Sequence, residues 1–257
     1  MPAVVETEEG GTWVVKFRGA GQGPRALLAE LIVGGLAQAA GLPMPELALV
    51  EVDPALGRGE RDPEIQDLLK ASHGVNVGLR YLEGAFNFDS RAAGELVAPE
   101  LAAELVWFDA LVTNPDRTAR NPNIMIHQGR PWLIDHGAAL FAHHAWSRVD
   151  ELRTRTPFEA IQDHVLLERA ANLEAADARL APRLGEDVVE EVLASLPVDL
   201  LLDPLVRNEF ETADAHRDRY RTYLLERLRE PRPFLAAAVE ARERVLREPR
   251  RRLESRR

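Results

Sequence analysis

The chain has no cysteine among its 257 residues. This excludes disulfide bonds, thiolate nucleophiles and zinc sites built from cysteine. Long uncharged apolar runs are also missing, since the apolar stretch at 26–42 is short and carries Glu30 and Gln38. A bilayer span needs about 20 apolar residues. We therefore expect no membrane helix and no signal peptide, and a cytoplasmic location.

Lysine is the second scarcity, because Lys16 and Lys70 are the only two in a chain rich in arginine. The net charge of −10 argues against non-specific nucleic-acid binding by the body of the protein. Residues 242–257 are the local exception, with eight arginines and three glutamates. We interpret this tail as a solvated helix end, although it could also contact nucleic acid or an acidic partner.

Hydrophobic periodicity divides the chain into a mainly β first part and a mainly α remainder. Runs of β-branched and aromatic residues predict strands at 12–17, 47–52 and 75–82. Apolar residues at helical spacing predict helices at 25–40, at 63–72 and from Pro99 onward, and an almost entirely helical pattern from residue 157. We expect an α+β fold that changes character near residue 82.

The segment 114–137, NPDRTARNPNIMIHQGRPWLIDHG, carries polar residues at both ends of a predicted β-hairpin. Residues 124–126 and 132–134 have the apolar character of strands, and 127–130 form a polar turn between them. The two strands of a hairpin bring their outer ends together. We therefore expect the loop before the first strand and the acid after the second to lie at one site.

These residue types suit phosphoryl transfer. Asp116 could orient or accept the proton of an attacking hydroxyl, while Asn121 or Asn123, with Asp135, could hold Mg²⁺ against nucleotide phosphates. An ordinary loop is the competing interpretation, because Asp and Asn also form turns. Asp135 favours function, since it follows an apolar strand, where a carboxylate needs a partner or a metal.

A second pair of charged residues lies near the start of the chain. Alternation along the strand at 12–17 places Lys16 opposite Val15 and Phe17. Glu30 lies among apolar residues of the next predicted helix, where an acid is unexpected unless a cation meets it. A strand lysine held by a helix glutamate is a kinase device for binding nucleotide phosphates. Solvent exposure of either residue is the simpler alternative.

Taken together, the motifs WVVK, ALLAE, NPDRTARNPNIMI and WLIDHGAAL resemble the small HipA-like branch of the protein-kinase-like superfamily. The part DR, NIMI and IDHG is also similar to phosphatidylinositol kinases. The likeness covers roughly residues 2–164. It is the combination of the motifs that makes it specific.

The resemblance implies a two-lobed kinase-like fold, with a small mainly β lobe at 1–82 and a larger helical lobe at 83–257, and ATP and Mg²⁺ between them. In the first lobe Lys16 would contact phosphates and Glu30 would be its helix partner. In the second, Asp116 would be the catalytic-loop acid and Asp135 the metal ligand. The acceptor would be a hydroxyl group, with Ser or Thr of a protein favoured over a lipid or small molecule.

The resemblance also implies a segment that binds adenine and an asparagine that binds the metal, for which two positions are possible. The segment Tyr81, Leu82 and Glu83, at the lobe junction, would offer backbone groups to adenine. The kinase spacing selects Asn121 as the metal asparagine, whereas adjacency to the following strand selects Asn123. We favour Asn123, because the hairpin fixes its position.

The sequence differs from the kinase pattern in the segment before Lys16. Only fifteen residues precede it, with Gly10 and Gly11 where a hairpin turn should be, so a strand and glycine-rich phosphate lid have no room. A non-catalytic nucleotide-sensing or partner-binding module is therefore a rival interpretation. The glycine-rich stretch 19–23 is interpreted as a connection into the following helix.

Histidines suggest a third interpretation, a metal-dependent phosphohydrolase that uses Asp116, Asp135 and histidine. His143 and His144 lack a matching metal motif, which favours structural roles. His136 could pack beneath the loop. Arg117 could pair with Asp135 or with phosphate, or be structural.

Overall fold

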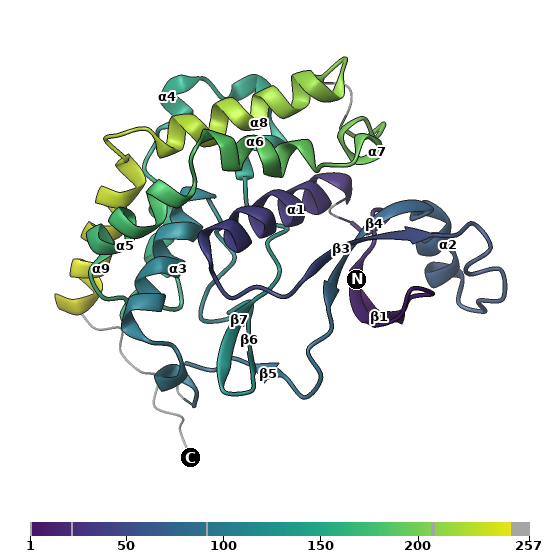
Figure 1. Cartoon of the computed structure of the whole chain (residues 1–257), viewed down its shortest axis with the longest axis horizontal. Coiled ribbons are helices and arrows are strands. Elements are labelled where there is room, and N and C mark those ends of the chain that lie inside the picture. The colour runs from purple at the N-terminus through teal and green to yellow at the C-terminus, as the bar shows by residue number, and fades with distance from the viewer. Residues whose placement is uncertain (1, 22, 91, 207–208, 248–257) are drawn as a thin grey trace.

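The computed structural model describes residues 2–21, 23–90, 92–206 and 209–247. Figure 1 shows an antiparallel sheet built from the first part of the chain beside a larger, mainly helical body. The α+β fold and the change from strands to helices are as the sequence predicts.

The amino-terminal sheet has four antiparallel strands in the order β1, β2, β4, β3. Their bounds are β1 (Pro2–Glu6), β2 (Thr12–Lys16), β3 (Leu47–Val52) and β4 (Gly74–Arg80). Lys16 thus lies on an inner strand, paired with Pro2 of β1 and Val77 of β4. Lys16 is therefore not on an edge of the sheet.

Two helices accompany this sheet. The longer one, α1 (Gly23–Ala40), begins after the glycine-rich stretch. The shorter one, α2 (Pro63–Ala71), is capped by Asp62, whose side chain accepts hydrogen bonds from two backbone N–H groups of its first turn. Side chains alternate between the two faces of β2, and those of Trp13 and Val15 lie in a small hydrophobic core under α2. Lys16 is left on the opposite face, which the α1 helix approaches.

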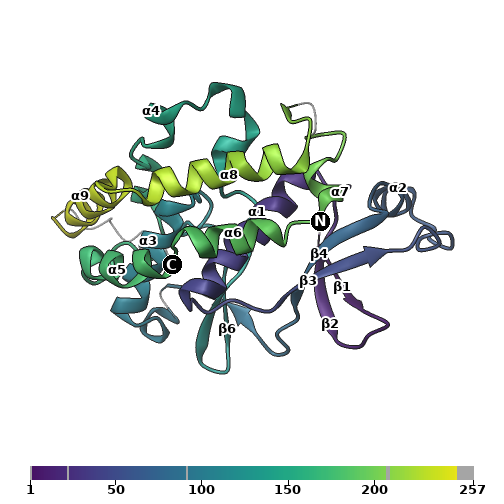
Figure 2. The same ribbon diagram turned by 45° about the horizontal axis from the view of Figure 1, so that its top comes forward.

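A second, three-stranded sheet lies below the helical body (Figures 1 and 2). Its strands are β5 (Phe86–Asn87), β6 (Ile124–His127) and β7 (Arg130–Leu133), in that order. The predicted hairpin is confirmed, with Ile124 opposite Leu133. Strand β5 was not predicted, because two residues are too few to carry a periodic pattern.

The rest of the described chain is mainly helical. The α-helices are α3 (Pro99–Leu111), α4 (Glu151–Thr154), α5 (Leu173–Leu180), α6 (Glu186–Ala194), α7 (Val198–Leu201), α8 (Ala213–Leu228) and α9 (Pro233–Arg247). Short 3-10 helices lie at Gly94–Leu96, Phe141–His144, Trp146–Arg148, Glu159–Asp163 and Ala181–Arg183. None of the helices in these described ranges is both long and apolar enough to cross a membrane.

One large hydrophobic core runs from α1 through α3 and the hairpin to α9. The α1 helix packs against α6 and α7, although it follows β2 directly in the chain (Figure 2). It therefore links the amino-terminal sheet rigidly to the helical body. In the basic tail, 242–247 belong to α9, and its remaining residues lie outside the described ranges.

Candidate active site

Three elements far apart in the sequence meet at Lys16. Its Nζ donates hydrogen bonds to Glu30 Oε1, on α1, and to Asp135 Oδ1, directly after β7, the latter at 2.6 Å. The Glu30 side chain is fully buried, whereas that of Asp135 is 48% exposed. A buried glutamate thus anchors the lysine, and an accessible carboxylate faces it.

The pairing of opposite charges affects the pKa values of all three residues of this triad, Lys16, Glu30 and Asp135. Burial alone would lower the pKa of Lys16, but the Glu30 and Asp135 carboxylates outweigh it and raise this pKa above its ordinary value. Burial raises the pKa of Glu30, against the opposing effect of Lys16. The pKa of Asp135 is lowered, because the Lys16 charge outweighs its partial burial. Near neutral pH the exposed end of the triad is therefore an anionic carboxylate beside a cationic lysine.

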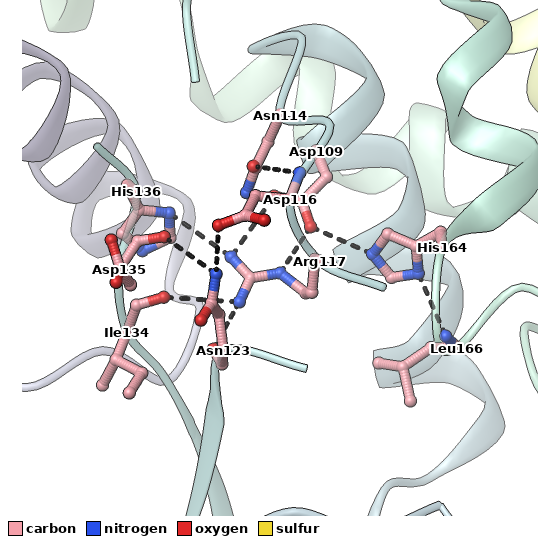
Figure 3. Close-up of polar contacts among 10 residues, drawn as sticks. All are labelled: Asp109, Asn114, Asp116, Arg117, Asn123, Ile134, Asp135, His136, His164 and Leu166. Atoms are coloured by element: carbon pink, nitrogen blue, oxygen red, sulfur yellow. Dashed lines mark hydrogen bonds and ion pairs between the residues drawn. The ribbon is translucent and has the colours of Figure 1, made fainter. Parts of the chain in front are cut away.

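The loop before β6 brings both candidate asparagines to Asp116. Asn121 Nδ2 donates to Asp116 Oδ2 at 2.8 Å, and Asn123 Nδ2 donates to the same oxygen at 3.2 Å. The backbone N–H of Asp116 donates to Asn114 Oδ1 at 3.1 Å. The loop therefore fixes Asp116 from several sides (Figure 3).

The hairpin joins this loop to Asp135. Asn123 and Asp135 stand at its two outer ends, and both have left-handed backbone conformations, with φ of 48° and 55°. Such conformations are uncommon for residues other than glycine, and they are often found at functional sites. Asn123 Nδ2 also lies 3.5 Å from the Asp135 carbonyl oxygen. The two sequence motifs therefore form one cluster.

The cluster suits a hard divalent cation. Because Asn123 uses its amide nitrogen as a donor, its Oδ1 atom is the part of the side chain able to bind a metal. The half-exposed Asp135 carboxylate supplies a charged oxygen donor. Oxygen ligands of this kind are what Mg²⁺ prefers. Asn121 is exposed, and its side chain contacts Asp116 rather than Asp135.

Comparison with known protein families gives a match over most of the chain. A sequence model of the HipA-like kinases matches residues 1–177. The chain belongs to the HipA-like kinase family. No curated protein sequence matches it.

A solved structure supports the fold of this HipA-like kinase over nearly its whole length. The crystal structure of the proinflammatory kinase CtkA of Helicobacter pylori is similar to it, with a TM-score of 0.56, and the match covers 95% of each chain. At 15% sequence identity the likeness shows the kinase-like fold alone.

Of the three alternatives for Arg117, the structure supports the structural role, because its charged partner is Asp109 and not Asp135. Its guanidinium is buried and pairs with Asp109 of α3 (Figure 3). It also donates to the backbone carbonyl of Asn123 and lies 3.4 Å from His136 Nδ1. One arginine thus ties the catalytic loop, α3 and both ends of the hairpin together.

Two further residues complete this buried network. Asn114 Nδ2 donates to Asp109 Oδ1 at 3.0 Å. His164 Nδ1 accepts from the backbone N–H of Leu166, so its Nε2 carries the proton that is donated to Asp109 Oδ2 at 2.9 Å. Burial opposes ionisation of Asp109, but Arg117 and His164 outweigh it and hold the Asp109 pKa far below its ordinary value. Asp109 is therefore an ionised carboxylate at the centre of the network, bonded to Asn114, Arg117 and His164.

His136 packs beneath the loop, as predicted. It is fully buried, and burial together with the nearby Arg117 charge lowers its pKa to about 3. His143 is buried too and bonds Tyr220. Throughout the described ranges, no group of three or more histidine, cysteine or acidic side chains is placed to hold a metal. This weighs against the phosphohydrolase interpretation, which needs histidine near the two aspartates.

The predicted adenine-binding segment follows β4. The backbone N–H of Tyr81 already donates to the Thr12 carbonyl at 2.9 Å, and Leu82 accepts from Ala85 in a turn. Tyr81 and Glu83 are exposed and Leu82 is half-buried. Any adenine contact from Tyr81 must therefore use its carbonyl group.

Sequence reasoning missed Asp109 and His164. Asp109 did carry a signal, because it is the one acid in the apolar run 105–111 of α3, much as Glu30 lies among apolar residues of α1. His164 lies 55 residues further along the chain, and only the fold brings it to Asp109.

Proposed function

We propose that this HipA-like kinase transfers the γ-phosphate of ATP, in a Mg²⁺-dependent reaction, to a serine or threonine hydroxyl of a protein. The observation that carries the proposal is the contact of Lys16 with both Glu30 and Asp135. A lysine held between a helix glutamate and a metal-site aspartate is the arrangement on which kinases rely. ATP would lie between a lobe at 1–82 and a lobe at 83–257.

The chain's own groups have distinct roles in this proposal. Lys16 places its charge against nucleotide phosphates, and Glu30 keeps it in position. Asp116 orients the acceptor hydroxyl and accepts its proton. Asn123 and Asp135 would hold Mg²⁺, which supplies charge neutralisation at the phosphate oxygens when bound. Asn121 positions Asp116, and the segment Tyr81, Leu82 and Glu83 would contact adenine.

Substitution of Asp116 tests the proposal. Asp116→Asn keeps a side chain of the same shape but removes the proton acceptor, so phosphate transfer should fall by about 10²-fold or more. Stabilisation of the folded protein by ATP and Mg²⁺, measured as a shift in Tm, should persist. Asp199→Asn, at an exposed position in α7, is the control. Transfer by Asp116→Asn at the wild-type rate would contradict the assigned role.

A non-catalytic nucleotide-binding module is a second candidate, supported by the direction of the first hairpin. Pro2 pairs with Lys16, so the turn at 7–11 lies at the far end of the hairpin from this lysine. That turn therefore does not cover the phosphates. Thermal stabilisation by ATP with no Mg²⁺-dependent hydrolysis or transfer would favour the module over the enzyme.

A further inference from the structure

A cavity of about 650 Å³ opens beside the catalytic loop. Thr113 and Pro115, which directly precede Asp116 along the loop, line one side of it. The other sides come from the segment 141–160, which includes α4, and from α8, both on the upper side in Figure 1. Its volume is within the range of ligand sites. The cavity therefore lies against the loop that carries Asp116.

The walls of this cavity are largely apolar. Phe141, Val149, Pro157 and Phe158 line it together with several alanines. The Phe141 side chain is 67% exposed, although a large aromatic ring is usually buried. An exposed ring at the rim of a concave apolar site is a typical anchor for a partner's apolar side chain.

Three arginines also line the cavity, and no acidic residue does. Arg227 is buried, and its guanidinium donates hydrogen bonds to the backbone carbonyls of Leu111, Thr154, Ala110 and Thr156. Among the described contacts, the Arg153 guanidinium donates to the Arg148 carbonyl, and neither arginine forms an ion pair. In a chain of net charge −10, this is a local excess of positive charge.

The acids nearest in sequence are already engaged. Asp150 caps α4 by accepting from the Arg153 backbone N–H at 2.8 Å. Glu151 pairs with Arg229 on the outer surface, at 2.7 Å. Arg148 and Arg153 therefore stay available to an anionic group that arrives with a ligand.

We propose that this cavity binds the acceptor protein through an extended segment that carries a large apolar residue and an acidic residue close to the phosphorylated serine or threonine. The apolar residue would pack against Phe141 and Phe158, and the carboxylate would pair with Arg148 or Arg153. This inference rests on the proposed function, because it names the substrate of that same site. The cavity would then set which hydroxyl reaches Asp116.

The lining favours a peptide over a lipid head group. The aromatic and aliphatic part of the lining forms no hydrogen bonds with the hydroxyls of a sugar-like head group, whereas it matches an apolar side chain. The net charge of −10 also opposes approach to an anionic membrane surface. A segment of mixed apolar and acidic character satisfies both parts of the cavity.

Binding of defined peptide pools, measured without nucleotide, tests the proposal separately from catalysis. The probes are short fluorescein-labelled pools with a central serine, in which the other positions hold apolar and acidic, apolar and basic, or only small polar residues. We expect the apolar and acidic pool to bind at least about tenfold more tightly than the others by fluorescence anisotropy. Preference for the basic pool, or binding only to phosphatidylcholine vesicles that contain phosphatidylinositol, would overturn the proposal.

Variants of residues that line the cavity test whether the peptide pool binds there. Phe141→Ser and Arg148→Glu change exposed side chains, so both should fold and keep the Tm shift caused by ATP and Mg²⁺. Each should weaken binding of the apolar and acidic pool by about tenfold. Arg58→Glu reverses an equally exposed charge in the loop before α2 and should have no effect. Equal loss in the Arg58 variant, or none in the other two, would place the binding elsewhere.

The two proposals fail differently. If the apolar and acidic pool binds but is never phosphorylated, the proposed function fails and the binding site stands. If phosphate is transferred to other pools with no such preference, the kinase stands and the assignment of this cavity is wrong.

Discussion

At the scale of single residues, Glu30 and Asp135 affect Lys16 differently although both are carboxylates. The Glu30 side chain is fully buried and does not contact solvent, so it holds Lys16 in one position. Asp135 is half exposed and can turn toward a metal. When a cation draws Asp135 away, Glu30 alone holds the lysine. The positioning of Lys16 in the nucleotide complex should therefore depend on Glu30.

Glu30→Gln tests this dependence. Glutamine keeps the shape and a hydrogen-bond acceptor but loses the charge, so Lys16 should be held less firmly and its pKa should fall. We expect kcat/KM for ATP to fall by about tenfold or more. Glu100→Gln, in the first turn of α3, is the control. An unchanged kcat/KM in the Glu30 variant would exclude this anchoring role.

Asp109 should dominate stability near the catalytic loop. Asp109→Asn leaves the buried Arg117 guanidinium without its carboxylate partner, which costs about 3–5 kcal/mol in the free energy of unfolding. Denaturant unfolding measures this cost. Glu104→Gln removes one partner of the partly exposed pair with Arg179 and should cost no more than about 1 kcal/mol. Similar losses in both variants would contradict a special role for the buried network.

The role of a site residue could be predicted from the sequence where the residue stands out from its neighbours. Glu30 and Asp135 were recognised because each places a charge within or directly after an apolar run. The sequence leaves the role of Arg117 open, since its partner, Asp109, belongs to a helix whose pattern indicates only an apolar face. The pairing depends on how α3 packs on the loop, which periodicity does not encode.

At the scale of elements, the β6–β7 hairpin sets the distance between Asn123 and Asp135. Its turn residues, Gln128 and Gly129, both have positive φ, 51° and 73°. That combination defines the type I′ turn, whose twist matches the two strands. The turn lies at the closed end of the hairpin, and the two metal-site residues lie at the open end.

Gly129→Ala should weaken both the hairpin and the metal site. The strained backbone should cost about 1 kcal/mol in the free energy of unfolding. A shifted register would also misplace Asn123 against Asp135, so a higher Mg²⁺ concentration should be needed for activity. Gly10→Ala, in the β1–β2 turn, is a matched control with φ of 91° and nothing within 4 Å of the added carbon.

Both variants should lose similar stability, but only Gly129→Ala should change the Mg²⁺ dependence of activity. Equal Mg²⁺ dependence in the two variants would show that the hairpin does not control the metal site.

Elements with a regular pattern could be predicted, and irregular ones could not. The strand at 47–52 and the helix from Pro99 have the predicted positions, because their periodicity and end signals are strong. The cavity wall at 141–160 consists of short 3-10 helices, the four-residue helix α4 and loops. Such segments take their form from the surfaces they cover, so the sequence alone does not reveal the cavity.

At the scale of the whole molecule, α1 connects the two parts of the proposed site. Its Glu30 holds the lysine of the amino-terminal sheet, while its other buried residues belong to the large core of the helical body. Movement of the sheet against that body would therefore strain the Lys16 pair. The division into lobes at residue 82 stays a prediction.

Acid should destabilise the whole molecule through its buried histidines. His136, His143 and His164 have pKa values lowered chiefly by burial. A histidine with a lowered folded-state pKa contributes stability that is present above its unfolded value of 6.5 and is lost as pH falls toward the folded value. For His136 this window runs from 6.5 down to about 3. Asp109, whose pKa is also lowered, adds to the loss at still lower pH, while the raised pKa of Glu30 opposes it.

The free energy of unfolding, measured with denaturant at a series of pH values, checks this expectation. Each buried neutral histidine should contribute a slope of about 1.4 kcal/mol per pH unit below 6.5. His136→Asn removes one titrating group, so its slope should be smaller by that amount even if the variant is less stable at pH 7. A wild-type slope in the His136 variant would mean that this ring is not kept neutral by the fold.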